Sequence, residues 1–217
     1  MAFPRTPSAA RLRTAVVGLL ALVSAAVPAT VPASADQGSR TTDVVIRYTE
    51  YGIPHIEASD YRGLGIGYGY AAAKDNICTL ADVYLTVRGD RSRYLGADAP
   101  ANPGLGAAAD SLNSDLYFRG VEASGVVQRT AHSAPPTGPE PDVAQLVRGY
   151  AAGYNRYLRE TGADGIDDPA CRGAAWVRPI TELDVYRHMH AIATVSGAGS
   201  AIDGIVGAQP PTAAAAR

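Results

Sequence analysis

The side chains of this 217-residue chain that are best suited to chemistry are two cysteines and four histidines. Cys78 and Cys171 stand far apart, and no second cysteine or histidine lies at ligand spacing beside either of them, which argues against a metal site. We predict that they form a disulfide, with two buried free thiols as the alternative. Closing so long a loop contributes up to about 4 to 5 kcal/mol in the chain-entropy model.

The histidines do not form a catalytic or metal-binding set by their spacing. His188 and His190 are two residues apart in a segment of helical pattern, so they project from different faces and are not expected to share a metal. His55 falls in a predicted strand. We interpret it as a packed or hydrogen-bonded residue rather than as a catalytic base.

The first 35 residues have the pattern of an export signal. Arginines at positions 5, 11 and 13 precede an uncharged apolar run from Thr14 to Val27, and Ala33-Ser34-Ala35 is the small-x-small pattern of a cleavage site. The run is shorter than the roughly 20 apolar residues of a membrane span. We predict cleavage after Ala35 and a secreted, extracellular protein, a location that favours the disulfide.

The charge pattern narrows the range of partners. The chain has 19 basic and 21 acidic residues and a formal net charge of −2. It shows no long run of like charge and no basic amphipathic helix. We therefore expect neither nucleic acid nor a membrane among its partners.

Two short segments near the start of the predicted mature chain have the pattern of a hairpin. Residues 43–48 (DVVIRY) alternate and are β-branched, Tyr51-Gly52 supplies a turn, and residues 53–57 (IPHIE) return as a second strand. Pro54 has no N–H to donate, so this strand should lie at an edge. An isolated two-stranded hairpin is marginal in water, which predicts that something else extends the sheet.

Glycines at every second position from 63 to 69 alternate with larger residues and on their own imitate a strand. Apolar residues nevertheless continue at helical spacing as far as Leu85, and Ser59 or Asp60 is placed to cap a helix. We predict one long helix whose glycines let another backbone come close. The glycines lack the preceding strand and the spacing of a nucleotide-binding loop, which excludes that function.

Loops rich in Gly and Pro are predicted at 96–110 and 132–141, and three further helices are predicted between and after them. The first covers 110 to about 130. The second covers 141–161, carries a tyrosine stripe on its apolar face and ends at Gly162. The third begins at Thr181, which forms a capping box with Asp184, and should run through Val195.

Five segments occur in an order that is similar to one protein family. They are RYTEYGIPHIEASD, GYGYAAAKDNI, RGDRSRYLG, RGYAAGYNRYL and AWVRPITELDV. From about Asp43 to Pro211 the chain resembles the α-subunit of penicillin acylases, in particular the branch that acts on cyclic lipopeptides and penicillin V. Each motif alone is weak, but five in order are specific.

The resemblance implies an N-terminal-nucleophile hydrolase made as a precursor. Residues 1–35 would be the signal peptide, 36–211 the α-subunit and 212–217 a tail adjoining a spacer peptide, followed by a larger β-subunit. The implied fold is α+β, a helix-rich subunit that completes an αββα sandwich with the β-subunit. The nucleophile is implied to be the first residue of the β-subunit, a serine, so no catalytic residue is expected in this chain.

The resemblance also implies a role for the end of the last helix in binding the acyl group. Counted from Asp184, the pocket positions fall on Ala193, Ser196 and Gly197, where relatives specific for phenylacetyl groups have bulky residues. Small residues imply a deeper apolar channel that suits a long fatty acyl chain. The alternative is that they let two helices pack closely.

The same count places Asp203 where relatives have a carboxylate that helps to bind calcium between the subunits. A carboxylate suits calcium, although one residue does not make a site. The resemblance thus implies a structural calcium ion, with a helix-end or turn role for Asp203 as the alternative. The reaction itself is expected to need no cofactor.

These patterns together predict the α-subunit of a secreted heterodimeric amidohydrolase. Its expected partners are the β-subunit and an acylated substrate, namely a lipopeptide, penicillin V or an N-acyl amino acid. An acyl-homoserine-lactone acylase of the same superfamily is one alternative. A non-catalytic secreted binding module that folds alone is the other.

Overall fold

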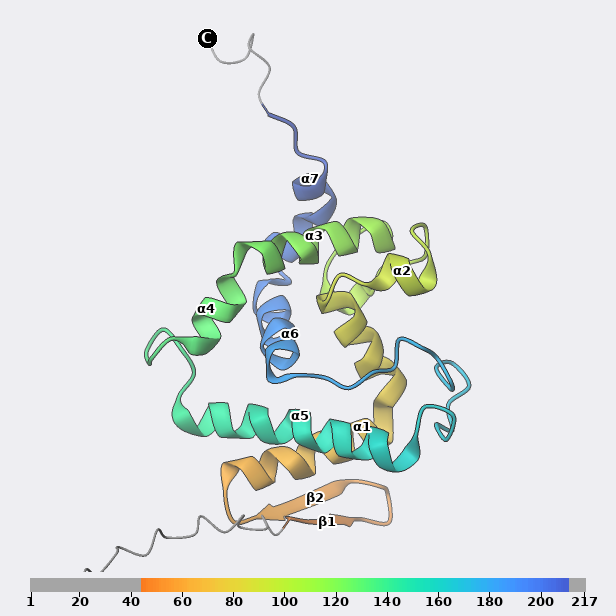
Figure 1. The fold of residues 1–217 in the computed structure, drawn as a ribbon, viewed down its shortest axis with the longest axis vertical. Coiled ribbons are helices and arrows are strands. Elements are labelled where there is room, and N and C mark those ends of the chain that lie inside the picture. Colours follow the sequence, from red (N-terminus) through yellow and green to blue (C-terminus); the bar gives the residue numbers. More distant parts are fainter. Residues whose placement is uncertain (1–43, 211–217) are drawn as a thin grey trace, which may run out of the picture. The chain divides into compact units, whose positions relative to one another are not determined.

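The computed structural model describes residues 44–210 of the chain (Figure 1). The predicted signal peptide 1–35 and the predicted tail 212–217 lie outside the described residues. Among residues 44–210, no helix is long and apolar enough to cross a membrane. The elements in chain order are β1 (Val44–Tyr48), β2 (Pro54–Ala58), α1 (Tyr61–Val87), α2 (Arg91–Leu95), η1 (Pro103–Leu105), α3 (Ser111–Ser124), α4 (Val126–His132), α5 (Pro141–Thr161), α6 (Glu182–Thr194), η2 (Ala198–Ala201) and α7 (Ile202–Val206).

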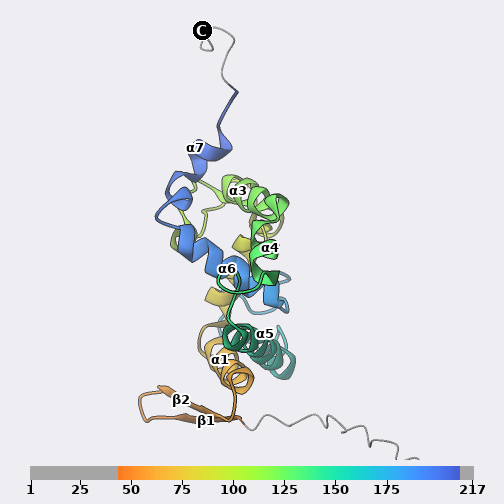
Figure 2. The same cartoon turned by 90° about the vertical axis from the view of Figure 1, so that its left-hand side faces the viewer.

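The predicted hairpin is confirmed. Strands β1 and β2 pair antiparallel with Ile46 opposite Ile56, and they are the only strands among residues 44–210. The side chains of Val44 and Ile56 lie against Gly67 of α1, so one face of the hairpin packs on that helix. His55 is exposed on the other face, opposite Arg47. Figures 1 and 2 both show the hairpin and α7 at opposite ends of the described residues.

Helices α1 and α5 pack with their backbones in unusually close contact. A Cβ atom on Gly65 or Gly69 would overlap carbonyl oxygens of α5, and one on Gly149 or Gly153 would overlap carbonyl oxygens of α1. Asp60 caps α1, because its Oδ1 accepts a hydrogen bond from Gly63 N at 2.6 Å. Both the cap and the close approach were predicted from the sequence and are confirmed.

Helix α1 is not the single regular helix that the sequence predicted. Asn76 has φ −145° and ψ 39°, which breaks the helical geometry between two segments. The three residues at the break, Lys74 to Asn76, are exposed, whereas Ile77 directly after it is buried. An asparagine side chain readily hydrogen-bonds to nearby backbone groups in non-helical conformations, so interrupting α1 at Asn76 costs little free energy.

The helix predicted over 110 to about 130 is also divided. Gly125 takes a left-handed φ of 66° and ends α3, and α4 continues from Val126. Glycine adopts this left-handed conformation without steric cost, which explains why the predicted helix is interrupted at Gly125. The start is as expected, since Asp110 accepts a hydrogen bond from Asn113 N at 2.8 Å.

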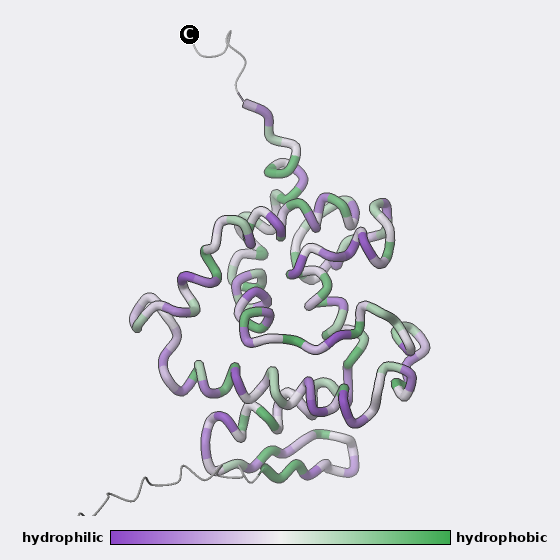
Figure 3. Tube along the Cα trace, in the orientation of Figure 1, coloured by the Kyte–Doolittle hydropathy of each residue, from purple (hydrophilic) through white to green (hydrophobic). Residues whose placement is uncertain are grey.

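Helix α5 has the predicted bounds, and Gly162 follows it at φ 70°. Apolar and polar residues alternate along it, as Figure 3 shows. Its tyrosine stripe belongs to the core: Tyr154 is fully buried and meets the ring of Tyr84 edge to face, with centroids 5.6 Å apart. The stripe is therefore structural, as the periodicity predicted.

The two cysteines form a disulfide in the structure. Cys78 lies in α1 just after its break, and Cys171 is buried in the irregular segment 163–180 between α5 and α6. The backbone hydrogen bonds of this segment form turns only, so the disulfide fastens to α1 a part of the chain that has no helix or strand of its own.

Candidate functional site

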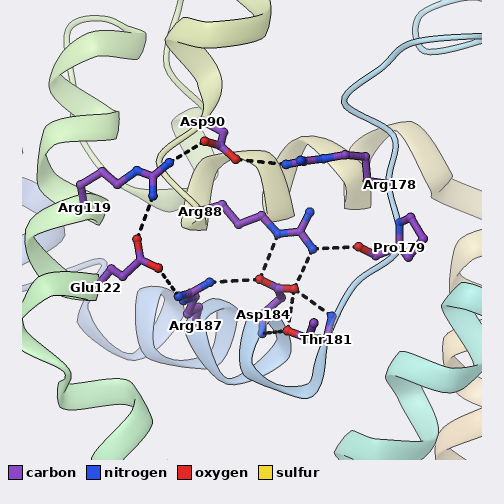
Figure 4. Close-up of a pocket in the computed structure, with 9 residues that line it drawn as sticks. All are labelled: Arg88, Asp90, Arg119, Glu122, Arg178, Pro179, Thr181, Asp184 and Arg187. Carbon is purple, nitrogen blue, oxygen red and sulfur yellow. Dashed lines mark hydrogen bonds and ion pairs between the residues drawn. The ribbon is translucent and has the colours of Figure 1, made fainter.

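The first turn of α6 is held by a buried charged residue, Asp184. Its Oδ2 accepts the N–H of Thr181 at 2.8 Å and completes the predicted capping box, which is confirmed. Arg88 at the end of α1 donates to both carboxylate oxygens, Nη2 to Oδ2 at 2.6 Å and Nε to Oδ1 at 3.0 Å (Figure 4). Burial alone would raise the pKa of Asp184, but hydrogen bonds from Arg88 and Thr181 outweigh it and lower that pKa. The direction of α6 is thus fixed from its start.

The second half of α6 lines an apolar hollow, here called the α6 pocket. It has a volume of about 400 Å³ and lies between α4, the loop after α4, the start of α5, and α6. Ala193, one of the three predicted acyl-binding residues, lines it, together with Val127, Val143, Tyr186 and Met189. A small residue at 193 leaves this hollow open.

A second apolar hollow, here called the α7 groove, lies on the side of α6 that faces α3 and α7. Its volume is about 600 Å³, and Leu116 of α3 and Ile205 of α7 line it with exposed fractions of 52% and 47%. His190 borders both hollows. The C-terminal half of α6 therefore separates two apolar surfaces that the described residues leave uncovered.

Ser196 and Gly197, the other two predicted acyl-binding residues, lie apart from the α6 pocket. Both are exposed in the turn after α6 and line neither hollow. A Cβ on Gly197 would meet only Thr194 O at 3.6 Å, which is ordinary contact. Close packing within the described residues therefore does not require a small residue at 197.

Close packing does explain a glycine that faces this stretch, Gly106 in the loop before α3. The carbonyl oxygen of Gly199 would lie 2.7 Å from a Cβ on Gly106, which has φ 137°, and Ala107 N donates to the same oxygen at 2.8 Å. The loop before α3 is thus tied to η2. Acyl binding at Ala193, Ser196 and Gly197 stays a prediction.

The sequence did not predict any helix after Val195, yet η2 and α7 are present there. Ile202 is the reason, because it is almost fully buried and anchors this last turn to the core. Ile202, Ile205 and Val206 are too few, in a segment otherwise rich in glycine and alanine, to give a periodic signal over the length of a helix. The α7 groove could not be predicted for the same reason.

Asp203 makes structural hydrogen bonds. Its Oδ1 accepts from Ala109 N at 3.0 Å and from Asn113 Nδ2 at 2.9 Å, which joins α7 to the start of α3. Within residues 44–210 no group of three or more His, Cys, Asp or Glu side chains could hold a metal ion. Because calcium takes six to eight oxygen ligands, the residues present do not fit calcium by themselves. The turn role is the one that the contacts support.

The two histidines of α6 have different surroundings, as their spacing predicted. His188 is half-buried against the ring of Tyr84, with centroids 6.1 Å apart, and burial lowers its pKa. His190 borders the apolar hollows instead. In the described part of the chain, no serine, threonine or cysteine side chain is hydrogen-bonded to a histidine ring. The nucleophile expected on a separate subunit stays a prediction.

Two groups of residues around α6 were missed by sequence reasoning. One is the lining of the α6 pocket from α4 and α5, which comes together only through the break at Gly125. The other is a set of charged residues near the start of α6, drawn in Figure 4. Only Arg88 and Asp90 of the segment RGDRSRYLG belong to this set, and its other members are dispersed along the chain.

Comparison with known proteins identifies the family. Residues 43–209 match the family model for penicillin amidase. The chain belongs to the penicillin amidase family, which confirms the resemblance seen in the five ordered segments.

Two curated relatives show how much of a full-length protein this chain represents. It is 40% identical to aculeacin-A acylase of Actinoplanes utahensis over 212 residues, which is 96% of this chain and 26% of that protein. It is 42% identical to acyl-homoserine lactone acylase PvdQ of Pseudomonas putida over 187 residues, 86% of this chain and 22% of that protein. The chain thus spans about a quarter of the length of these relatives.

A solved structure of similar fold is the thermostable penicillin G acylase from Alcaligenes faecalis. The TM-score is 0.58 at 23% identity, and the match covers 72% of this chain and 75% of that chain. At this identity the likeness concerns the fold. It confirms the predicted helix-rich α+β class.

Proposed function

We propose that this chain is the smaller subunit of a secreted two-subunit acylase that removes long acyl chains from lipopeptides, penicillin V or N-acyl amino acids by amide hydrolysis. Both curated relatives carry the name acylase, and the chain corresponds to about a quarter of each. The remaining three quarters would supply the larger subunit and the nucleophile.

The observation that carries the substrate class is the α6 pocket. Its lining is mostly apolar, and the small side chain of Ala193 leaves it open. A linear acyl chain is the ligand that gains most from such a surface. Burial of each methylene contributes up to about 0.8 kcal/mol, so kcat/KM should rise about fourfold per carbon until the channel is filled.

Exposed apolar residues support the proposed second subunit. Tyr51 and Ile53 at the tip of the hairpin are 84% and 58% exposed, and the hairpin has no third strand among residues 44–210. A sheet from the partner would extend it and cover these residues. In the proposed reaction, the partner's serine oxygen attacks the amide carbonyl, the C–N bond breaks with proton transfer to the leaving amine, and water then hydrolyses the ester.

Hydrolysis of N-acyl homoserine lactones is a second candidate. The 42% identity to an acyl-homoserine lactone acylase favours it. The same acyl pocket would serve both, because the two substrate classes differ only in the amine that leaves.

The test is an acyl-length series on the assembled enzyme from its own host. N-acyl amino acids and N-acyl homoserine lactones of matched chain length separate the two candidates. In wild type kcat/KM should climb with chain length, and Ala193→Phe should end the climb at a shorter chain. Ala123→Phe, on the exposed face of α3, is the matched control and should leave the series unchanged. A flat series, or one that Ala193→Phe does not shorten, would contradict the proposal.

A further inference from the structure

A hollow of about 490 Å³ near the start of α6 is lined by charged residues, here called the charged ring. They come from the end of α1 and the residues after it, from α3, from the segment before α6, and from α6 itself. The members of the ring are Arg88, Asp90, Arg119, Glu122, Arg178, Asp184 and Arg187 (Figure 4).

Each carboxylate of the charged ring binds two arginines. Asp184 binds Arg88 at 2.6 Å and Arg187 at 3.3 Å. Glu122 binds Arg187 at 2.6 Å and Arg119 at 2.9 Å. The alternation of cation and anion continues without a break through these contacts.

The last carboxylate of the ring is Asp90, which binds Arg119 at 2.6 Å and Arg178 at 3.0 Å. The alternating series therefore has an arginine at each end, Arg88 and Arg178. It contains four guanidinium groups and three carboxylates, so one positive charge has no carboxylate of its own.

A backbone contact brings the two ends of the series near each other. Arg88 Nη2 donates to Pro179 O at 2.9 Å, and Pro179 comes directly after Arg178 in the chain. Between Arg88 and Arg178, unlike between the other neighbouring arginines of the ring, no carboxylate bridges the two guanidinium groups. In Figure 4 one terminal nitrogen of the Arg88 guanidinium has no dashed line and is directed toward the side of the ring where Arg178 lies.

Both end arginines keep donors that no described residue uses. Arg88 donates through Nε and Nη2 only, and its side chain is 14% exposed. Arg178 donates through Nη2 to Asp90, while its Nε is buried without a hydrogen-bond partner. Arg178 is held in place by the face of the Tyr94 ring, 5.3 Å from its guanidinium carbon. A buried donor without a hydrogen-bond partner destabilises the folded protein, so an acceptor at this position would stabilise it.

We propose that the gap between Arg88 and Arg178 is an anion-binding site that takes one carboxylate. A planar carboxylate matches two guanidinium edges, balances the excess charge and completes the alternation of the ring. Two sources share this chemistry. One is an Asp or Glu side chain of the proposed second subunit, and this source rests on the proposed function. The other is a free small anion, which needs no partner.

The deciding experiment is a crystal structure of the protein in its native assembly, grown or soaked in sodium bromide. Bromide is the probe for a free anion, because its anomalous signal distinguishes it from water. A bromide peak beside Arg88 and Arg178 supports the free-anion source. A partner carboxylate within hydrogen-bond distance of both supports the other source. Water alone in the gap overturns the proposal, whether or not a second subunit is present.

Two variants separate a built site from an adventitious ion only. Arg178→Gln should lose the bromide peak, whereas Arg156→Gln, which alters an exposed arginine paired with Glu160, should keep it. Equal peaks in Arg178→Gln and wild type would indicate an adventitious ion only and would contradict the proposal. If Arg178→Gln does not assemble, the wild-type structure still decides between occupied and empty.

Discussion

Small residues occur in two regions of this chain and have opposite uses. Where α1 crosses α5, each of four glycines replaces a side chain that would overlap the backbone of the other helix. After α6, a side chain on Gly197 or Gly204 would meet nothing closer than ordinary contact. A glycine can therefore permit contact or leave space, and only the atoms that lie above it decide which.

The same contrast runs along α6. Its first turn is buried and bound by charged hydrogen bonds, whereas its last turns border two apolar hollows. One end fixes the position of the helix and the other leaves surface available to a ligand or a partner. Substitutions should therefore change stability at the first end and activity at the second.

The largest effect is expected at the fixed end. Asp184→Asn leaves Arg88 without its buried partner and should lower the free energy of unfolding by about 3 to 5 kcal/mol, measured by urea denaturation of the assembled protein. Asp203→Asn is the control and should change it by less than about 0.5 kcal/mol, because the amide oxygen still accepts from Ala109 and Asn113. Equal losses in both variants would contradict the contrast.

Asp184 also gives a pH dependence with a defined sign. Its pKa is lowered in the folded protein, so its contribution to stability is complete above the ordinary pKa of an aspartate, about 4, and is lost as pH falls through the lower folded value. The free energy of unfolding should therefore decrease less as pH falls below about 4 in Asp184→Asn than in wild type.

At the helix crossing, Gly69→Ala should cost about 3 kcal/mol, because the added methyl group overlaps the carbonyl of Tyr150 and the two backbones must separate. The matched control is Gly120→Ala in α3, where nothing lies within 4 Å of a new Cβ. That change should raise stability by about 0.5 to 1 kcal/mol, because alanine favours the helix. Thermal unfolding measures the stability of both variants. An unchanged stability of Gly69→Ala would disprove the close approach of the two helices.

In the turn after α6, Gly197→Phe should leave the free energy of unfolding within about 0.5 kcal/mol of wild type. It should lower kcat/KM for long acyl substrates about tenfold or more, equivalent to about 1.4 kcal/mol, if the acyl chain extends over the turn after α6 as we propose. Steady-state kinetics with short and long acyl amides measure this. A loss of stability as large as that of Gly69→Ala would show that Gly197 serves packing instead.

The smallest effect is expected at His188. Burial lowers its pKa, so the unfolded chain binds more protons than the folded protein just below the ordinary histidine pKa of about 6.5. Stability should be complete above that pH and decline modestly as pH falls through the folded value. His188→Phe, which can retain the contact with Tyr84, should flatten this decline in unfolding curves at pH 5 to 7. The same decline of stability with falling pH in His188→Phe as in wild type would exclude His188 as the source of the decline.

The sequence predicted those features that repeat at a regular period or accompany a local cap. The tyrosine stripe of α5, the capping box at Thr181 and the hairpin are of this kind. So is the close approach of α1 and α5, because glycines at a fixed spacing in a helix have few other uses. The family was recognisable because five segments keep their order.

Features that depend on distant contacts were not predicted. The breaks at Asn76 and Gly125 arise where the chain must turn to bury the apolar residues after each break, and no local pattern fixes that turn. The lining of the α6 pocket depends on the second break. The charged ring joins four parts of the chain, and each arginine taken singly is indistinguishable from a surface residue.

The central claim is that this chain is one of two subunits derived from a single precursor. Intact mass spectrometry with N-terminal sequencing, on the secreted protein purified without denaturant from its own host, tests it most directly. We predict that this chain, starting near Asp36, is recovered in complex with a larger polypeptide whose first residue is serine. Recovery of the chain alone, monomeric and folded, would contradict the claim.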